Sequence, residues 1–177
     1  MPVFPAVQNI DPIVISVASP QSIGAELNAM GLTSSLSALA TANKAYFIPF
    51  SVYAPFPAVK MMIMSGVPSG NVDTGVYDRG GKLLFSAGST PQSNATGTQP
   101  LTITPTTINP GEYFLAMSMD NTVGTVENFS GFVVNTARVL GIMELTNAFP
   151  LPSVVTFQAV SGVVRIPWVG VTRRLVV

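Results

Sequence analysis

Strict alternation of apolar and polar side chains marks a strand between residues 112 and 120. Successive side chains of a strand point to opposite faces of the sheet. One face of this stretch carries large apolar residues: Tyr113, Leu115, Met117 and Met119. The other face carries Phe114 and Ala116 between polar ends. We therefore expect one face to lie in a core and the other to be partly covered by a neighbour.

A hairpin is predicted between residues 72 and 85. Residues 72–78 and 82–85 form two extended runs, and Arg79-Gly80-Gly81 separates them. Glycine adopts the positive φ that a tight reversal demands, so this turn suits a hairpin. The run Gly80-Gly81-Lys82 superficially resembles a phosphate loop, but it leads into a strand rather than a helix N-terminus. We interpret it as a turn.

Further apolar runs alternate with turn residues along most of the chain. Fifteen glycines and fifteen prolines punctuate it at short intervals, and this spacing is typical of many short strands. The other predicted strands span residues 13–17, 46–53, 58–65, 101–104, 131–140, 154–160 and 163–169. Helical signal is confined to residues 19–31 and to a small-residue stretch at 34–42. The pattern predicts an all-β, antiparallel jelly-roll sandwich with at most one or two short helices.

The chain divides into two predicted parts. Residues 1–44 are expected to form an extended, proline-bearing arm and a short helical connection, and residues 45–177 the sandwich. Residues 86–100 and 120–128 are polar, so both are expected to lie in solvent or against a partner. The arm and a C-terminal strand at residues 171–177 are candidates for reaching a neighbouring subunit.

Charged residues are unusually scarce. They make up 9% of the 177 residues, eight basic against eight acidic, and the mean hydropathy is +0.48. An ordinary soluble domain carries roughly 25% charged residues. A net charge of zero removes the repulsion that keeps copies apart. We expect much of the surface to be covered by other protein copies.

The same composition argues against several partners and locations. Nucleic-acid binding rests on clustered Lys and Arg, and only Arg173 and Arg174 stand together. No uninterrupted apolar run approaches the roughly 18 residues of a membrane span. Residues 1–5 lack the charged and apolar regions of a secretory signal. We therefore predict no nucleic acid, no membrane and synthesis in a cytosol.

Candidate chemistry is sparse. The chain has no His and no Cys, so the usual Ser-His-Asp, Cys-His and imidazole or thiolate zinc sites are excluded. The acids are Asp11, Glu26, Asp73, Asp78, Glu112, Asp120, Glu127 and Glu144. Asp73 and Asp78 point to opposite faces of one strand, whereas Glu112 and Asp120 lie about 27 Å apart in an extended chain. Neither pair suits a glycosidase. We predict no catalytic, cofactor-binding or metal-binding residue and no enzyme.

Three weaker candidates accompany that prediction. The loop at residues 120–128 offers oxygen ligands for Ca²⁺, although the EF-hand spacing is absent and ordinary turn chemistry explains it as well. Met61, Met62, Met64, Met117 and Met119 suit either an adaptable surface or, more often, a core. Trp168 suits either an interface or the cap of a core.

Several stretches resemble jelly-roll virion proteins of tailed bacteriophages. The matching runs are residues 42–52 (ANKAYFIPFSV), 69–78 (SGNVDTGVYD), 81–89, 109–116 (NPGEYFLA), 148–152 (AFPLP) and 166–167. Together they span roughly residues 42–170. They are turns and strand cores, so they are more specific for the fold than for a role. Members of the group are head-surface, fibre or tail components.

The resemblance implies a non-enzymatic virion protein. Its small size and lone β domain favour a capsid decoration or cement subunit that contacts itself, as a homotrimer, and the major capsid protein. The alternative is a tail-associated or receptor-binding module that recognises a host glycan through loops. Tyr77, Tyr113 and Trp168 are the aromatic residues left open for stacking on a sugar.

Overall fold

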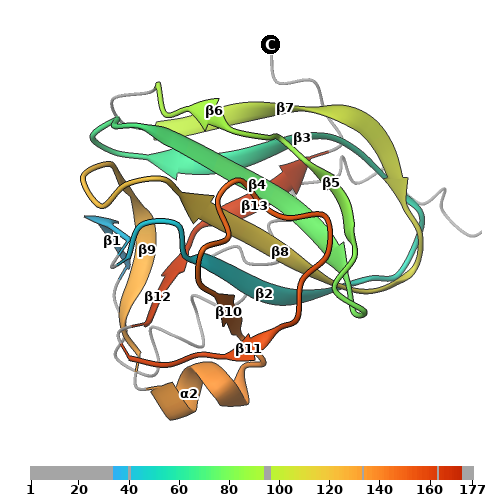
Figure 1. The fold of residues 1–177 in the computed structure, drawn as a ribbon. Coiled ribbons are helices and arrows are strands. Elements are labelled where there is room, and N and C mark those ends of the chain that lie inside the picture. Colours follow the sequence, from blue (N-terminus) through green and yellow to red (C-terminus); the bar gives the residue numbers. More distant parts are fainter. Residues whose placement is uncertain (1–33, 40, 94–96, 133, 163, 173–177) are drawn as a thin grey trace, which may run out of the picture.

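The computed structural model describes residues 34–39, 41–93, 97–132, 134–162 and 164–172. Two antiparallel sheets pack face to face in this part of the chain (Figure 1). The prediction of an all-β antiparallel sandwich is confirmed. Residues 1–33 of the predicted arm and helical connection, with the strand at residues 13–17 and the helix at residues 19–31, lie outside the described residues.

Sheet A contains six strands. They are β1 (Ser34–Ala38), β3 (Phe56–Ser65), β7 (Gly97–Ile108), β9 (Thr125–Phe132), β12 (Val164–Pro167) and β13 (Val169–Thr172). β1 and β12 both pair with β9, whereas β7 and β13 both pair with β3. Strand β1 lies before residue 45, in the stretch where small residues favoured a helical turn. The sandwich therefore includes residues that the sequence assigned to the arm.

Sheet B contains seven strands. They are β2 (Ala45–Val52), β4 (Asn71–Asp78), β5 (Leu83–Ser86), β6 (Thr90–Pro91), β8 (Gly111–Met119), β10 (Met143–Leu145) and β11 (Gln158–Ala159). The strand order is β11-β10-β2-β8-β4-β5, and β6 also pairs with β4. The centre of this sheet follows the predicted strands closely, because strong alternation fixes which face of β8 is buried.

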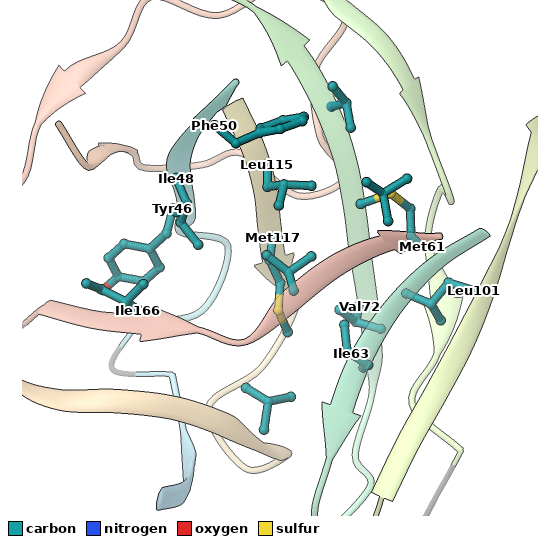
Figure 2. Packing of buried hydrophobic residues seen from close by; sticks show 14 of the residues in the cluster. Tyr46, Ile48, Phe50, Met61, Ile63, Val72, Leu101, Leu115, Met117 and Ile166 are labelled. Atoms are coloured by element: carbon teal, nitrogen blue, oxygen red, sulfur yellow. The ribbon is translucent and has the colours of Figure 1, made fainter. Parts of the chain in front are cut away.

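The sandwich core fills the space between the sheets. Figure 2 shows side chains from β2, β3, β7, β8 and β12 converging there, and Ile48, Met61, Ile63, Leu115 and Met117 are almost wholly buried. Met61, Met62, Met117 and Met119 are buried, and Met64 is half-buried. Met61, Met117 and Met119 belong to the sandwich core, which was the more common of the two expectations, whereas Met62 lies in neither core cluster. The alternation in β8 also points Leu115 and Met117 inward, as predicted.

The opposite face of sheet B carries a second apolar cluster. This outer cluster contains Ala45, Phe47, Tyr77, Phe114, Ala116, Ala148, Leu151 and Val155. The sequence predicted that a neighbour partly covers this face, and residues 148–157 of the same chain provide that cover. We call these residues the cover segment. Figure 1 shows the connection between β10 and β11 passing in front of sheet B.

The predicted hairpin joins β4 to β5. Asp78 N–H donates to the Lys82 carbonyl, and Gly81 N–H donates to the Asp78 carbonyl. Gly81 has φ +84°, and a Cβ there would lie 2.2 Å from the carbonyl oxygen of Val155. Both the backbone conformation and the close approach of the cover segment therefore require glycine.

The predicted strand at residues 131–140 is wrong. β9 ends at Phe132, and helix α2 (Val134–Val139) follows. Val134, Ala137 and Leu140 pack on the core at a spacing of three, which is a helical period. The helix ends in a Schellman motif: Gly141 has φ +72°, and Ile142 N–H donates to the Ala137 carbonyl. Valine content favoured a strand, but this cap and spacing select a helix.

Two further expectations need correction. The predicted strand at residues 154–160 is mostly irregular, with a bridge at Val154 and the two residues of β11. The predicted polar loop at residues 86–100 contributes β6 and the start of β7 to the sheets. It also buries Gln92 and Gln99. Hydrogen bonds to the surrounding protein satisfy both amide side chains, so polar composition did not mean exposure.

The structure describes only the start of the predicted C-terminal strand at residues 171–177. β13 pairs with β3 of its own chain from Val169 to Thr172, and residues 173–177 lie outside the described residues. Within the described residues, no helix is long and apolar enough to cross a membrane.

Candidate functional site

A shallow pocket of about 230 Å³ opens at one end of β2 and β8. It is lined by Pro49, Phe50, Ser51, Arg79, Glu112, Tyr113 and Phe114. Pro49 pairs with Phe114 and Ser51 with Glu112, so these four residues share the outer face of sheet B. Phe50 and Tyr113, which pack with the sandwich core, also line the pocket, so it lies at the end of sheet B and reaches both of its faces. Its lining combines apolar groups with one acid and one base.

Arg79 and Glu112 form an ion pair at this pocket. The Arg79 Nη1 to Glu112 Oε2 distance is 2.5 Å, and both side chains are exposed. Arg79 directly follows β4 in the hairpin turn, and Glu112 lies in the first residues of β8, so the β4–β8 pairing brings them together. Exposed pairs of this kind contribute about 0–1 kcal/mol to folding. The nitrogen and oxygen atoms of the two side chains that the ion pair does not use can form hydrogen bonds with a ligand.

A buried ion pair lies at the junction of β2 and β10. Lys44 Nζ is 2.6 Å from Glu144 Oε2, and both side chains are almost fully buried. The Ser161 hydroxyl donates to Glu144 Oε1 at 2.7 Å, and Lys44 lies 5.4 Å from the centre of the Tyr46 ring. Removing either charge would leave the other uncompensated in the interior. We interpret the pair as a structural ion pair that stabilises the packing of β2 against β10.

The Tyr46 hydroxyl is unsuited to act as a base beside that pair. Burial and, to a smaller extent, the nearby Glu144 carboxylate raise the pKa of Tyr46 to about 12, against the lowering effect of Arg165. The phenol is therefore neutral at physiological pH. Arg165 donates to the Ala38 carbonyl and so joins β12 to the end of β1.

Asp73 is a buried acid that holds the cover segment in place by a hydrogen bond. Its Oδ2 accepts the Leu151 N–H at 2.9 Å. Burial raises the pKa of Asp73, and the hydrogen bond from Leu151 N–H opposes that rise. The Tyr77 hydroxyl donates to the Pro152 carbonyl at 2.6 Å. Burial, together with the Asp73 charge, raises the pKa of Tyr77. Both side chains serve the fold rather than an open site.

The remaining described acids are dispersed. Asp78 caps the hairpin turn by accepting the Lys82 N–H, and Glu127 lies on β9. Among the described residues, no three His, Cys, Asp or Glu side chains gather into a group that could hold a metal ion. Asp11 and Glu26 lie outside the described residues. The structure thus brings no two predicted acids into a facing pair within the part that it describes.

The loop considered for Ca²⁺ has its oxygens engaged by the protein. Asp120 accepts hydrogen bonds from the backbone and side-chain nitrogens of Asn71. Asn121 Oδ1 accepts the Val123 and Gly124 N–H groups. Burial acts to raise the pKa of Asp120, but hydrogen bonds from Asn121 and Asn71 outweigh it and hold the pKa below its usual value. These hydrogen bonds form a network that holds the loop in place.

Sequence reasoning missed the amide network that joins three loops. Gln92 Nε2 donates to the Ser65 hydroxyl at 2.8 Å and to the Thr125 carbonyl at 2.7 Å, while its Oε1 accepts the Ser69 N–H. Gln99 Nε2 donates to the Pro91 carbonyl at 2.8 Å. Nothing in the local pattern distinguishes Gln92 from a solvent-facing glutamine, because its partners lie 23 to 33 positions away in sequence.

Of the aromatic residues left open for sugar stacking, one is excluded. Tyr77 is completely buried. Tyr113 is half-buried beside Phe50, and its hydroxyl donates to the Asn109 carbonyl. Trp168 is half-buried, and its backbone N–H donates to the Glu127 carbonyl. Tyr113, at the pocket, is the better placed of the remaining two.

Comparison with known proteins adds no identification. No family model matches the sequence, and neither a curated protein nor a solved structure is detectably similar to it. The resemblance to phage virion proteins therefore stays a prediction.

Proposed function

We propose that the chain is a non-enzymatic structural protein of a bacteriophage virion, acting as a capsid decoration or cement subunit through protein–protein contacts. The observation that carries this proposal is the scarcity of charge in the chain together with several large apolar side chains exposed on its surface. Charged residues are 9% of the chain, and Tyr53 and Val139 are 92% and 87% exposed. The other large exposed apolar residues are Leu36, Val67, Leu84, Val123 and Val154. Interfaces between obligate partners are depleted in charge in this way.

The proposed partners are further copies of the chain and the major capsid protein. Closed cyclic symmetry satisfies identical surfaces without leaving an open end, and we propose a homotrimer. Synthesis would take place in the host bacterial cytoplasm and the final location would be the virion.

Sedimentation velocity at micromolar concentration tests the association. We expect a discrete oligomer for the unaltered chain. Replacing Tyr53, Val139 and Val154 with Ser should shift the distribution toward monomer, because these exposed side chains supply apolar area to the contacts. A matched control replaces the exposed Thr102, Thr104 and Thr107 with Ser and should leave the oligomer unchanged. A clean monomer for the unaltered chain would overturn the proposed assembly.

Immunogold electron microscopy of the parent particles tests the location. Antiserum against the recombinant chain should label the head surface of the virion. Label confined to the tail would replace decoration with a tail role, and unlabelled particles would exclude a virion protein.

The pocket favours a second candidate, recognition of a host glycan by a tail-associated module. Pro49 and Phe114 provide an apolar floor, and Arg79 and Glu112 provide exposed hydrogen-bonding groups. A glycan-array screen should then detect binding that Arg79→Ala abolishes and Lys82→Ala retains, since Lys82 is exposed on the same hairpin outside the pocket lining. Binding at background level would remove this candidate.

A further inference from the structure

Within the described residues, β1, β7, β12 and β13 each pair with one main strand of sheet A, and the sequences of β1 and β7 differ in how they protect an edge. β7 pairs with β3 and contains Pro100 and Pro105, which have no N–H to offer. β1 pairs with β9, and its sequence, Ser-Ser-Leu-Ser-Ala, contains neither proline nor a charged residue. Natural sheets usually protect an edge with such residues, because unpaired backbone groups attract another strand. The edge at β1 lacks this protection.

Exposed aliphatic side chains surround the unprotected edge. Leu36 on β1 is 46% exposed, Val67 is 62% exposed and Val123 is 67% exposed. A Cβ placed on Gly66 would lie 3.1 Å from Leu36 Cδ2, so Leu36 lies against the start of the β3–β4 loop. The Thr125 N–H donates to the Val67 carbonyl at 2.9 Å, which brings the loop that contains Val123 to the same corner. Figure 1 shows β1 and β9 together at this border of the sandwich.

The chain holds a matching segment close to β1 in sequence. Residues 13–17 read Ile-Val-Ile-Ser-Val, are uncharged and are predicted to be a strand. Ile13, Ile15 and Val17 share one face of such a strand. The 16 residues from 18 to 33 separate the segment from Ser34, and this length allows the chain to turn back along β1. All pairings recorded in the two sheets are antiparallel.

We propose that residues 13–17 pair antiparallel with the outer edge of β1 in the same chain. The segment then satisfies the backbone groups of the edge, and Ile13, Ile15 and Val17 lie on the sheet face that carries Leu36. The same pairing also covers the exposed side chains of Leu36, Val67 and Val123. This inference goes beyond the proposed function and does not depend on it, since the pairing requires no virion and no second copy.

Disulfide trapping tests the pairing cleanly, because the natural chain contains no cysteine. Leu36→Cys is combined in turn with Ile13→Cys, Ile15→Cys and Val17→Cys, and each full-length variant is oxidised mildly. Facing residues of antiparallel strands have Cα atoms about 4.5–5.5 Å apart, within the range that a disulfide spans. We expect an intramolecular disulfide for one of the three pairs, identified by non-reducing electrophoresis and peptide mass. Thr104→Cys on the edge of β7 replaces Leu36→Cys in the matched control and should give none.

Hydrogen exchange provides a second measurement that needs no cysteine. Ile15→Pro removes a backbone N–H from the segment, and amides of β1 should then exchange at least about tenfold faster, while amides of β8 are unchanged. Three outcomes would overturn the proposal: no disulfide in any register together with unchanged exchange, equal trapping by Thr104→Cys, or disulfides between chains alone. The last outcome would assign the edge of β1 to a second copy.

Discussion

The two faces of sheet B are both apolar, yet they are built differently. The inner face meets sheet A through aliphatic and methionine side chains such as Ile48, Leu115 and Met117. On the outer face, aromatic rings contact one another in a small cluster: the Phe47 and Tyr77 rings lie 5.3 Å apart, and the Phe114 and Phe157 rings 4.5 Å apart. Regular strands cover the first face, whereas the irregular cover segment covers the second.

This difference predicts unequal resistance to local opening. The sandwich core is closed by continuous ladders of two sheets, so exposing it requires global unfolding. The cover segment is held by the aromatic contacts and a few hydrogen bonds: Leu151 N–H to Asp73, Tyr77 to the Pro152 carbonyl, Leu83 N–H to the Ser153 carbonyl and Val155 N–H to the Gly81 carbonyl. The outer face can therefore lose its cover while the sandwich stays folded.

The largest expected effect comes from breaking the buried ion pair beside the inner face. Glu144→Ala leaves the Lys44 ammonium buried without its carboxylate, and we expect the free energy of unfolding to fall by about 3–5 kcal/mol. Urea denaturation followed by circular dichroism measures this loss. Lys44→Met combined with Glu144→Leu removes both charges and should recover most of it. A Glu144→Ala variant as stable as the natural chain would show that the pair contributes nothing to the fold.

Leu115→Ala tests the sandwich core directly. Leu115 is completely buried, and truncation should cost about 2–5 kcal/mol through lost burial and the cavity left behind. Hydrogen exchange should rise together at the amides of sheets A and B, because the whole domain opens as one unit. Exchange that rises near β8 alone would contradict the idea that this core opens only globally.

Phe157→Ala tests the outer cluster with a smaller expected cost. The ring is half-buried and contacts Phe47 and Phe114, so we expect about 1–3 kcal/mol, less than for a fully buried ring. The amides of Leu83 and Val155, which bond between the hairpin and the cover segment, should exchange faster. The amide of Val76 at the centre of sheet B is the internal control and should keep its protection. Equal acceleration at Val76 would mean that both faces open together.

The sequence predicts the inner face well and the outer face poorly. Alternation in residues 112–120 identifies Leu115 and Met117 as core because a period of two is a local property. The cover segment has no period, and its contacts join residues such as Asp73 and Leu151, 78 positions apart. The composition shows that Phe114 needs a cover, but it does not show whether the cover comes from this chain or from another.

The residues of the candidate site can likewise be recognised singly in the sequence, but their contacts cannot. Glu112 and the hairpin that carries Arg79 are both visible in the sequence, but their meeting depends on the register of β4 against β8. Likewise, Lys44 and Glu144 are far apart in the sequence, and the pairing of β10 with β2 brings them together in the fold. Helix α2 escaped prediction because valines at its ends outweighed the capping signal of Gly141.

Asp73→Asn is expected to change stability least, and the sign of the change depends on pH. Asparagine keeps the size of the side chain and an oxygen for the Leu151 N–H, so in acid we expect a change of about 1 kcal/mol or less. Burial raises the pKa of Asp73 in the folded state above its unfolded value of about 3.9. The folded chain therefore binds this proton more tightly than the unfolded chain does.

It follows that the contribution of Asp73 to stability decreases as the pH rises from about 4 through the raised pKa, and then stays constant. The asparagine side chain of the variant does not titrate, so the variant should gain stability relative to the natural chain across that window. Denaturation midpoints at matched pH values between about 4 and 8 measure the difference. Exchange at the Leu151 amide shows whether the cover segment is affected before the sandwich core. A difference independent of pH would mean that the Asp73 carboxyl titrates alike in both states, and the cover would then rest on its aromatic contacts rather than on this acid.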